Sequence, residues 1–63
     1  MNNLALQMLV KFLEEKIEQH KIDIKLYQAS DRQIIAAFHE GLLTAREGDL
    51  SLVKVILAEE IQK

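Results

Sequence analysis

The two histidines, His20 and His39, are the side chains of this 63-residue chain that titrate nearest neutral pH, so they are its first candidates for chemistry. A histidine can transfer protons, ligate a metal ion or act as a pH switch. The chain has no Cys, which excludes disulfides and Cys-containing zinc sites, and two histidines alone are a poor metal framework. There is no Ser-His-Asp arrangement, no phosphate-binding glycine loop and no Glu-x-x-His pair. We therefore expect no enzyme activity, no metal, no cofactor and no small-molecule substrate.

His39 and Glu40, followed by Leu42 and Thr44, resemble the phospho-acceptor box of sensor histidine kinases, which lies on a dimeric helical hairpin. The match departs from that box by one residue after Glu40, and no proline follows Thr44. The resemblance implies a histidine phosphotransfer protein with His39 as an accessible acceptor. The alternative, which we prefer, is a structural histidine at the margin of an apolar helix face.

Residues 4–28 are predicted to form the first helix, because they contain neither Gly nor Pro and repeat their apolar side chains with helical spacing. One stripe alternates steps of three and four residues, which is the seam of a heptad pattern. It consists of Leu6, Val10, Leu13, Ile17, His20, Ile24 and Tyr27. His20 is either a pH-sensitive element or a histidine satisfied at the seam edge, where a polar residue can set helix register.

A second apolar stripe lies on roughly the opposite side of the same helix. It comprises Leu4, Met8 and Phe12, and then Ile22 and Leu26. A helix that is apolar on two sides must be covered on two sides. We therefore expect a partner or dimer interface formed by Leu4, Met8, Phe12, Leu6, Val10, Leu13, Ile17 and Ile24. The alternation over residues 22–26 is also typical of a strand, but the chain offers no second strand to pair with it. A helix is preferred there, and the alternative is a break near Lys21–Ile24 followed by an irregular segment.

A second helix is predicted over residues 31–47. Ser30 and Gln33 have the spacing of a capping box, in which each side chain binds the other residue's backbone N–H. The apolar face of this helix is formed by Ile34, Ala37, Phe38, Leu42 and Ala45. Gly41 lies in that face, and since a helical glycine costs about 1 kcal/mol relative to alanine, it indicates close approach by another helix. Leu43 falls on the polar side and is a further candidate contact for a partner.

Gly48 and Asp49 are the strongest turn signal in the chain. Glycine is typical of the left-handed position that ends a helix, and aspartate is typical of the residue that caps the next one. We therefore predict a third helix over residues 50–62. The segment 42–57 resembles an ankyrin helix pair and is also similar to a helix junction of sigma-factor-like domains, through Ala45, Gly48, Asp49, Leu50, Val53, Lys54 and Leu57. No second repeat is present, so both resemblances imply only two helices joined at a glycine.

Gln33, Ala37 and Gly41 have a spacing that resembles the first helix and turn of a DNA-binding helix-turn-helix. The position that should be apolar in its second helix is Glu47, and that helix offers only Arg46 as a contact to bases or phosphates. DNA binding normally needs several cationic contacts to phosphate. A small dimeric DNA-binding transcriptional regulator is therefore the second hypothesis for function, and nucleic-acid binding is disfavoured.

Length and composition set the expected class of protein. The 63 residues, 49% of them hydrophobic, form one domain over 1–63, and a domain of about 60 residues is marginal in stability. Without disulfides or metal, oligomerisation and regular helix packing remain as means of stabilisation. The net charge of -2, and the lack of a long apolar run or a signal-peptide pattern, predict a cytoplasmic protein that does not bind membranes.

We therefore expect an all-α protein, a two- or three-helix hairpin or small bundle that assembles as a homodimeric helical bundle. Its expected function is that of a small non-enzymatic regulator or adaptor of bacterial or phage origin. Such a protein would bind itself and a protein partner through its apolar helix faces.

Overall fold

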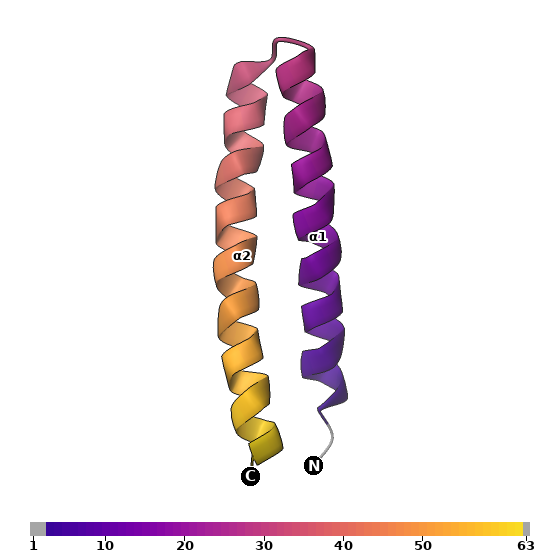
Figure 1. The fold of residues 1–63 in the computed structure, drawn as a ribbon, viewed down its shortest axis with the longest axis vertical. Coiled ribbons are helices and arrows are strands. Elements are labelled where there is room, and N and C mark those ends of the chain that lie inside the picture. Colours follow the sequence, from indigo (N-terminus) through magenta and orange to yellow (C-terminus); the bar gives the residue numbers. More distant parts are fainter. Residues whose placement is uncertain (1–2, 63) are drawn as a thin grey trace.

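Two long antiparallel helices make up the fold (Figure 1). The computed structural model describes the backbone of residues 3–62 and the side chains of residues 3–60; α1 comprises Leu4–Ala29 and α2 comprises Gln33–Gln62. The hairpin measures 49 × 15 × 11 Å along its principal axes. The prediction of an all-α helical hairpin is thereby confirmed. Within the described residues, neither helix contains an apolar stretch of the length needed to cross a membrane.

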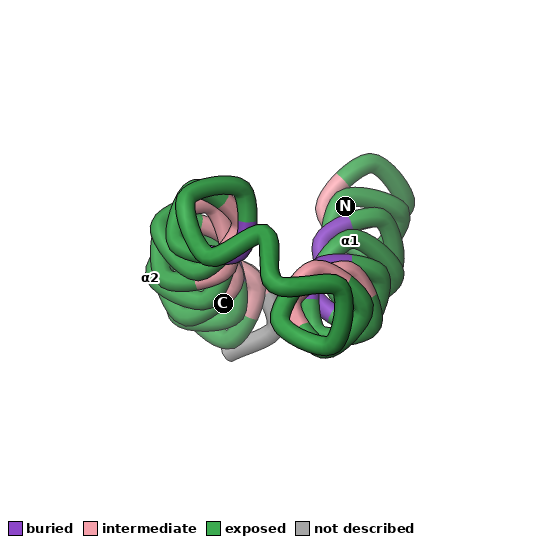
Figure 2. The backbone as a smooth tube through the Cα atoms, turned by 90° about the horizontal axis from the view of Figure 1, so that it is seen from above, coloured by how far each residue is buried: buried purple, intermediate pink, exposed green. Residues whose placement is uncertain are grey.

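The helices pack along the heptad seam that the spacing in α1 predicts. Leu13, Ile17 and His20 of α1 are buried in it, and Leu6, Val10, Ile24 and Tyr27 are half-buried. The seam of α2 again alternates three and four residues and consists of Ala36, His39, Leu43, Arg46, Leu50, Val53 and Leu57, of which Ala36 and Val53 are buried. Figure 2 shows that burial follows the line where the helices meet, while most of each helix is exposed. The core is therefore one narrow row of side chains.

A Schellman motif ends α1. The N–H of Arg32 donates to the carbonyl of Tyr27 at 2.8 Å, and the N–H of Asp31 donates to the carbonyl of Gln28 at 3.2 Å, which is the pair of bonds that defines this motif. Asp31 has a φ of 58°, the left-handed conformation that the motif requires at this residue. Aspartate tolerates this conformation better than most residues that carry a side chain, although glycine tolerates it best.

Ser30 closes α1 instead of opening α2. Its hydroxyl donates to the Leu26 carbonyl at 2.6 Å, and its N–H donates to the same carbonyl at 3.1 Å. The capping box predicted for Ser30 and Gln33 is therefore wrong. The first backbone bond of α2 is the one that the Ala36 N–H donates to the Arg32 carbonyl at 3.0 Å.

No turn interrupts α2 at Gly48 and Asp49. The helix is continuous over Gln33–Gln62, and neither glycine has a positive φ. The prediction of separate helices over 31–47 and 50–62 is therefore wrong. The physical reason is that a continuous helix keeps Leu50, Val53 and Leu57 against α1. Full burial of such a side chain stabilises by about 1.5–3 kcal/mol, which exceeds the helix penalty of about 1 kcal/mol for a glycine.

The face of α2 that meets α1 also differs from the predicted one. Phe38 and Ala45 of the predicted face are exposed, whereas Leu43, predicted on the polar side, is half-buried and lies beside Ile24. The close approach expected at Gly41 is absent, since a Cβ there would meet no atom from elsewhere in the described chain within 4 Å. The sequence of α2 has two stripes with alternating three- and four-residue spacing. The prediction took the more apolar stripe as the buried one, whereas the more polar stripe faces the seam of α1.

Candidate functional site

An apolar face runs along one side of the hairpin. Each residue of an α-helix is rotated by about 100° from the one before it, so the residue directly before a seam position lies to one side of the seam. Because the two helices are antiparallel, these residues lie on the same side of the hairpin in α1 and in α2. The large apolar side chains at these positions, which we call the apolar face, are exposed: Leu9, Phe12 and Leu26 on α1, and Ile35, Phe38, Leu52 and Ile56 on α2. Phe38 and Leu52 are 65% and 61% exposed. The same positions also carry Lys16, Gln19, Asp23 and Asp49, so polar side chains interrupt this largely apolar side of the hairpin.

A shallow groove of about 270 Å³ joins the two helices on the apolar face. Leu9 and Phe12 line it from α1, and Leu52 lines it from α2 together with Arg46 and Asp49. The buried seam residues Leu13 and Val53 lie between them. The groove shows that the exposed apolar side chains of the two helices form one surface.

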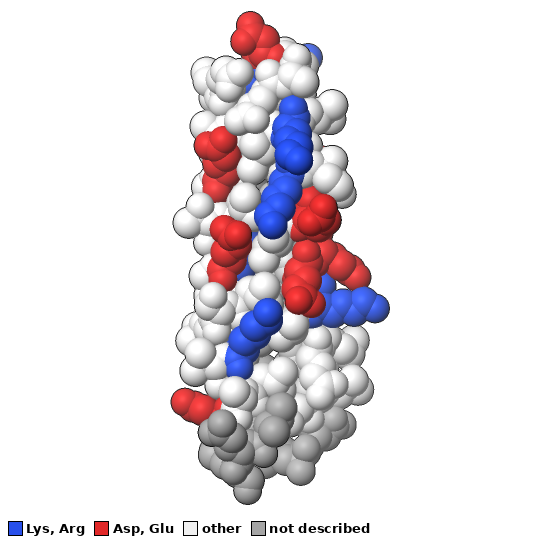
Figure 3. Space-filling view, viewed as in Figure 1, with Lys and Arg blue, Asp and Glu red and all other residues white. Residues whose placement is uncertain are grey.

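The opposite side of the hairpin is charged. The exposed residues that follow a seam position by one include Lys11, Glu14, Glu18, Lys21 and Lys25 on α1, and Glu40, Glu47 and Lys54 on α2. Figure 3 shows acidic and basic side chains side by side along both helices on this side. The Gln28 amide donates to the Glu40 carboxylate across the helices at 3.2 Å. A mixture of both signs of charge is typical of a solvated surface.

The predicted interface residues fall into two groups. Leu13 and Ile17 are buried, and Leu6, Val10, Ile24 and Leu43 are half-buried, in the seam between α1 and α2 of the same chain. Leu4, Met8 and Phe12 are exposed. Gly48 and Asp49 are exposed in the middle of α2 instead of forming a turn. The intramolecular seam thus covers the first group, and only the second group remains accessible.

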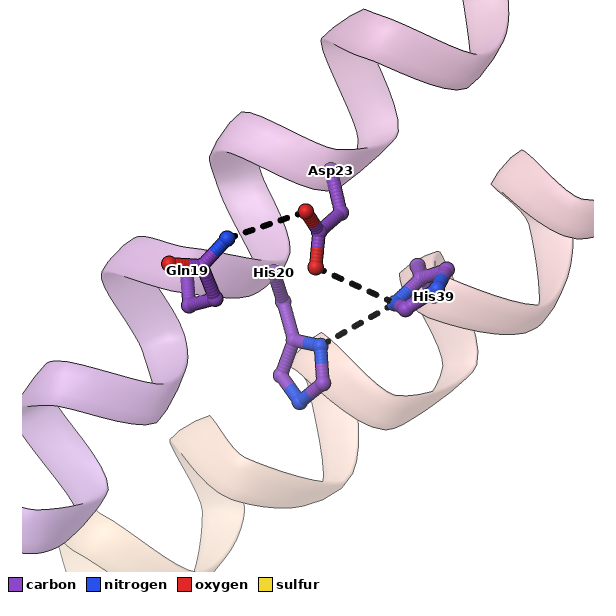
Figure 4. A network of polar contacts seen from close by, with 4 residues as sticks. All are labelled: Gln19, His20, Asp23 and His39. Atoms are coloured by element: carbon purple, nitrogen blue, oxygen red, sulfur yellow. Dashed lines mark hydrogen bonds and ion pairs between the residues drawn. The ribbon is translucent and has the colours of Figure 1, made fainter.

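A polar cluster of His20, Asp23 and His39 lies on the seam (Figure 4). The Nδ1 atoms of His20 and His39 are 3.2 Å apart, and Nδ1 of His39 is 4.0 Å from Oδ2 of Asp23. The Gln19 amide donates to Oδ1 of Asp23 at 3.0 Å. A hydrogen bond between two imidazole nitrogens needs a proton on one of them and a lone pair on the other, so only one of the two Nδ1 atoms carries a proton in this contact.

His20 is the buried member of the cluster. The residue is 8% exposed, and its Nε2 has no hydrogen-bond partner among the described residues. Burial, followed by the charges of His39 and Arg46, lowers the pKa of His20 below its ordinary value, and Asp23 opposes this shift. His20 is therefore held in its neutral form near pH 7.

Aromatic rings surround His39. The Tyr27 ring stacks on it with centroids 5.4 Å apart and planes at 16°, and the Phe38 ring meets it edge-on at 5.8 Å. The side chain of His39 is 18% exposed. His39 therefore lies in the seam, not at the accessible margin of an apolar face where the sequence predicts it.

The cluster contains residues that sequence reasoning missed. Two histidines alone predict no metal site, but Asp23 adds a carboxylate, and Gln19 and Tyr27 orient its members. A signal was present in the chain. His20 and Asp23 are three residues apart on one helix, and Asp23 and His39 are equally distant in sequence from Asp31, the turning residue of the hairpin.

The segment considered as a DNA-binding helix-turn-helix is straight. Gln33, Ala37, Gly41 and Glu47 all lie within the continuous helix α2, so the turn of that motif is not formed here. Comparison of the chain with protein-family models, with curated proteins and with solved structures found no match. The apolar face and the polar cluster are therefore the two features from which a function can be argued.

Proposed function

We propose that this chain is a small protein–protein interaction module, a cytoplasmic regulator or adaptor, that works as a homodimer with the apolar faces of two hairpins packed together. The observation that carries the proposal is the contrast between the exposed apolar face and the charged face on the opposite side of the same two helices. A helix pair of this kind has the pattern expected for half of a four-helix bundle.

The single layer of helices supports the same conclusion. Domains are normally built from two packed layers around a shared core, and the hairpin provides only one. A second copy supplies the missing layer. It presents an identical apolar face of equal length, as an interface with two-fold symmetry requires.

The accessible surface is also larger than that of a compact monomer. The hairpin exposes 4841 Å², whereas a folded monomer of 7.2 kDa exposes about 4,100 Å². The excess of about 700 Å² is close to the roughly 800 Å² that each partner buries in a standard interface. One partner of this chain's own size is enough to cover it.

Sedimentation velocity over a range of concentrations tests the dimer, with circular dichroism to follow helicity. Phe12→Glu and Leu52→Glu place a charge in the groove of the apolar face and are expected to abolish the dimer. Ala37→Glu is the matched control, because Ala37 is exposed next to a seam position on the charged face, and this variant is expected to dimerise like the parent. A parent chain that stays at 7.2 kDa at the highest attainable concentration would overturn the proposal.

A further inference from the structure

The polar cluster on the seam carries a second activity. We infer that His20, Asp23 and His39 bind a divalent transition-metal ion, and that Zn²⁺ is the ion their chemistry fits best. One ligand atom from each residue lies within 4.8 Å of the other two. Two imidazole nitrogens and a carboxylate oxygen are ligands that Zn²⁺ uses in proteins. All three residues belong to one chain, so this inference does not depend on the proposed dimer.

The spacing of the two imidazoles fits a shared ion. Their Nδ1 atoms are 3.2 Å apart. Two ligands of a tetrahedral Zn²⁺, with bonds of about 2.0–2.1 Å, lie ~3.3 Å from each other. The 4.0 Å between Nδ1 of His39 and Oδ2 of Asp23 exceeds this separation by less than about 1 Å, and the widest separation in the cluster, up to 4.8 Å, exceeds it by about 1.5 Å. The Asp23 side chain must therefore move toward the two imidazoles to complete the site.

Neighbouring side chains orient two of the ligands before an ion arrives. The Gln19 amide holds Oδ1 of Asp23, while Oδ2 of the same carboxylate points toward His39 (Figure 4). Tyr27 stacks on the ring of His39 and fixes its plane. Such supporting partners typically change metal affinity by about 10–100-fold.

The burial of His20 is a second observation, because a buried seam position favours an apolar side chain unless the imidazole has a role. His20 is more than nine-tenths buried, and its Nδ1 faces His39, whereas its Nε2 lies on the other side of the ring and lacks a partner within the described part of the chain (Figure 4). A leucine at this seam position would avoid the cost of burying an unpaired polar nitrogen. Metals bind the neutral imidazole, and the lowered pKa of His20 keeps the ring in that form.

The charged side chains around the cluster determine which ligand contributes most to the affinity for the ion. Arg46 and Lys16 oppose a positive charge at His20, whereas Asp23 favours one. Binding therefore depends on the Asp23 carboxylate, and Arg46→Gln is expected to tighten it. In the single chain, Asp23 and His39 have side chains that are 25% and 18% exposed, so water can reach the ion there as a fourth ligand.

Calorimetric titration of the metal-free protein with Zn²⁺ is expected to give one ion per chain. Asp23→Asn and His20→Leu remove ligands and are each expected to weaken binding by more than about 100-fold, which exceeds the roughly 10–100-fold effect of losing a single supporting partner. His20→Leu places an apolar side chain in the seam and keeps the hairpin folded, which circular dichroism checks. Asp49→Asn is the matched control, because it removes an exposed carboxylate outside the cluster and should leave the affinity unchanged.

Co²⁺ in place of Zn²⁺ adds a spectroscopic readout. We expect the strong visible absorption of tetrahedral Co²⁺ with the parent chain, and its loss in His20→Leu. Three results would overturn the inference. They are the absence of saturable Zn²⁺ binding, binding that survives both ligand substitutions, and a ratio of one ion to two chains, which would mean that the ion is shared between copies.

Discussion

The Nδ1 atoms of His20 and His39 lie 3.2 Å apart across the seam, although 19 residues separate them in the sequence. The two rings are not equivalent. His20 is buried with an Nε2 that has no partner among the described residues, whereas the His39 side chain is 18% exposed and stacked on Tyr27. The desolvation penalty of the pair therefore falls on His20, and substitutions at the two positions are expected to act differently.

Replacing His20 with leucine is expected to stabilise the metal-free hairpin by roughly 1–2 kcal/mol, because it removes a buried nitrogen that has no partner in the described chain. His39→Leu is the comparison. It leaves His20 buried and removes its hydrogen-bond partner, so it is expected to destabilise the fold. Urea unfolding in the presence of a chelator measures both variants. Stabilisation by both would contradict the difference drawn between the two histidines.

The metal-free protein is expected to lose stability as the pH falls below about 6.5. Burial, then His39, Arg46 and Lys16, lower the pKa of His20 in the folded state, and Asp23 only partly opposes them. The unfolded chain takes up this proton at the ordinary pKa, before the folded chain does, so protonation favours unfolding. The stability that comes from keeping His20 neutral is fully present above that pH, and it is lost as the pH falls toward the pKa of His20 in the folded state. Melting temperatures across this range should show a shallower pH dependence for His20→Leu than for the parent.

Gly48→Ala is expected to stabilise the protein by about 0.5–1 kcal/mol, because Gly48 lies inside α2 with a negative φ and open space where a Cβ would be. Gly41→Ala is the companion variant, since Gly41 has the same surroundings. A left-handed turn at Gly48 would give the opposite sign, because alanine is strained there. Thermal unfolding of the two variants decides between a continuous α2 and a helix that ends at Gly48.

Asp31→Gly is expected to raise stability by up to about 1 kcal/mol, because glycine adopts the left-handed conformation of this residue without strain. Asp31→Val should lower stability by about 1–2 kcal/mol, since a β-branched side chain is strained at positive φ. Asp31→Asn is the control and should change little, because asparagine also tolerates this conformation. Equal melting temperatures for the glycine and valine variants would show that the Schellman motif does not form in solution.

The first helix and its seam could be predicted from the sequence, because both depend on local periodicity. The predicted range of 4–28 agrees with the observed Leu4–Ala29, and the buried residues of α1, Leu13, Ile17 and His20, all belong to the predicted seam. A stripe with three-four spacing faces one direction on a helix whatever packs against it.

The second helix could not be predicted in the same way. Two of its stripes have three-four spacing, and Gly48 and Asp49 carry the local signal of a turn. Packing against the full length of α1 decides between these alternatives. The free energy gained from that packing exceeds the helix penalty of about 1 kcal/mol for a glycine, and it is gained only once the hairpin has formed.

The polar cluster shows the same division. Helical periodicity alone places His20 and Asp23 on one side of a helix and gives the chain more apolar stripes than one seam can cover. Helix packing brings His39 to the cluster and leaves Phe38 and Leu52 exposed. The physical reason is that periodicity is a property of one helix, whereas the register that brings three ligands together, and the choice of the stripe that is buried, are properties of two helices packed against each other.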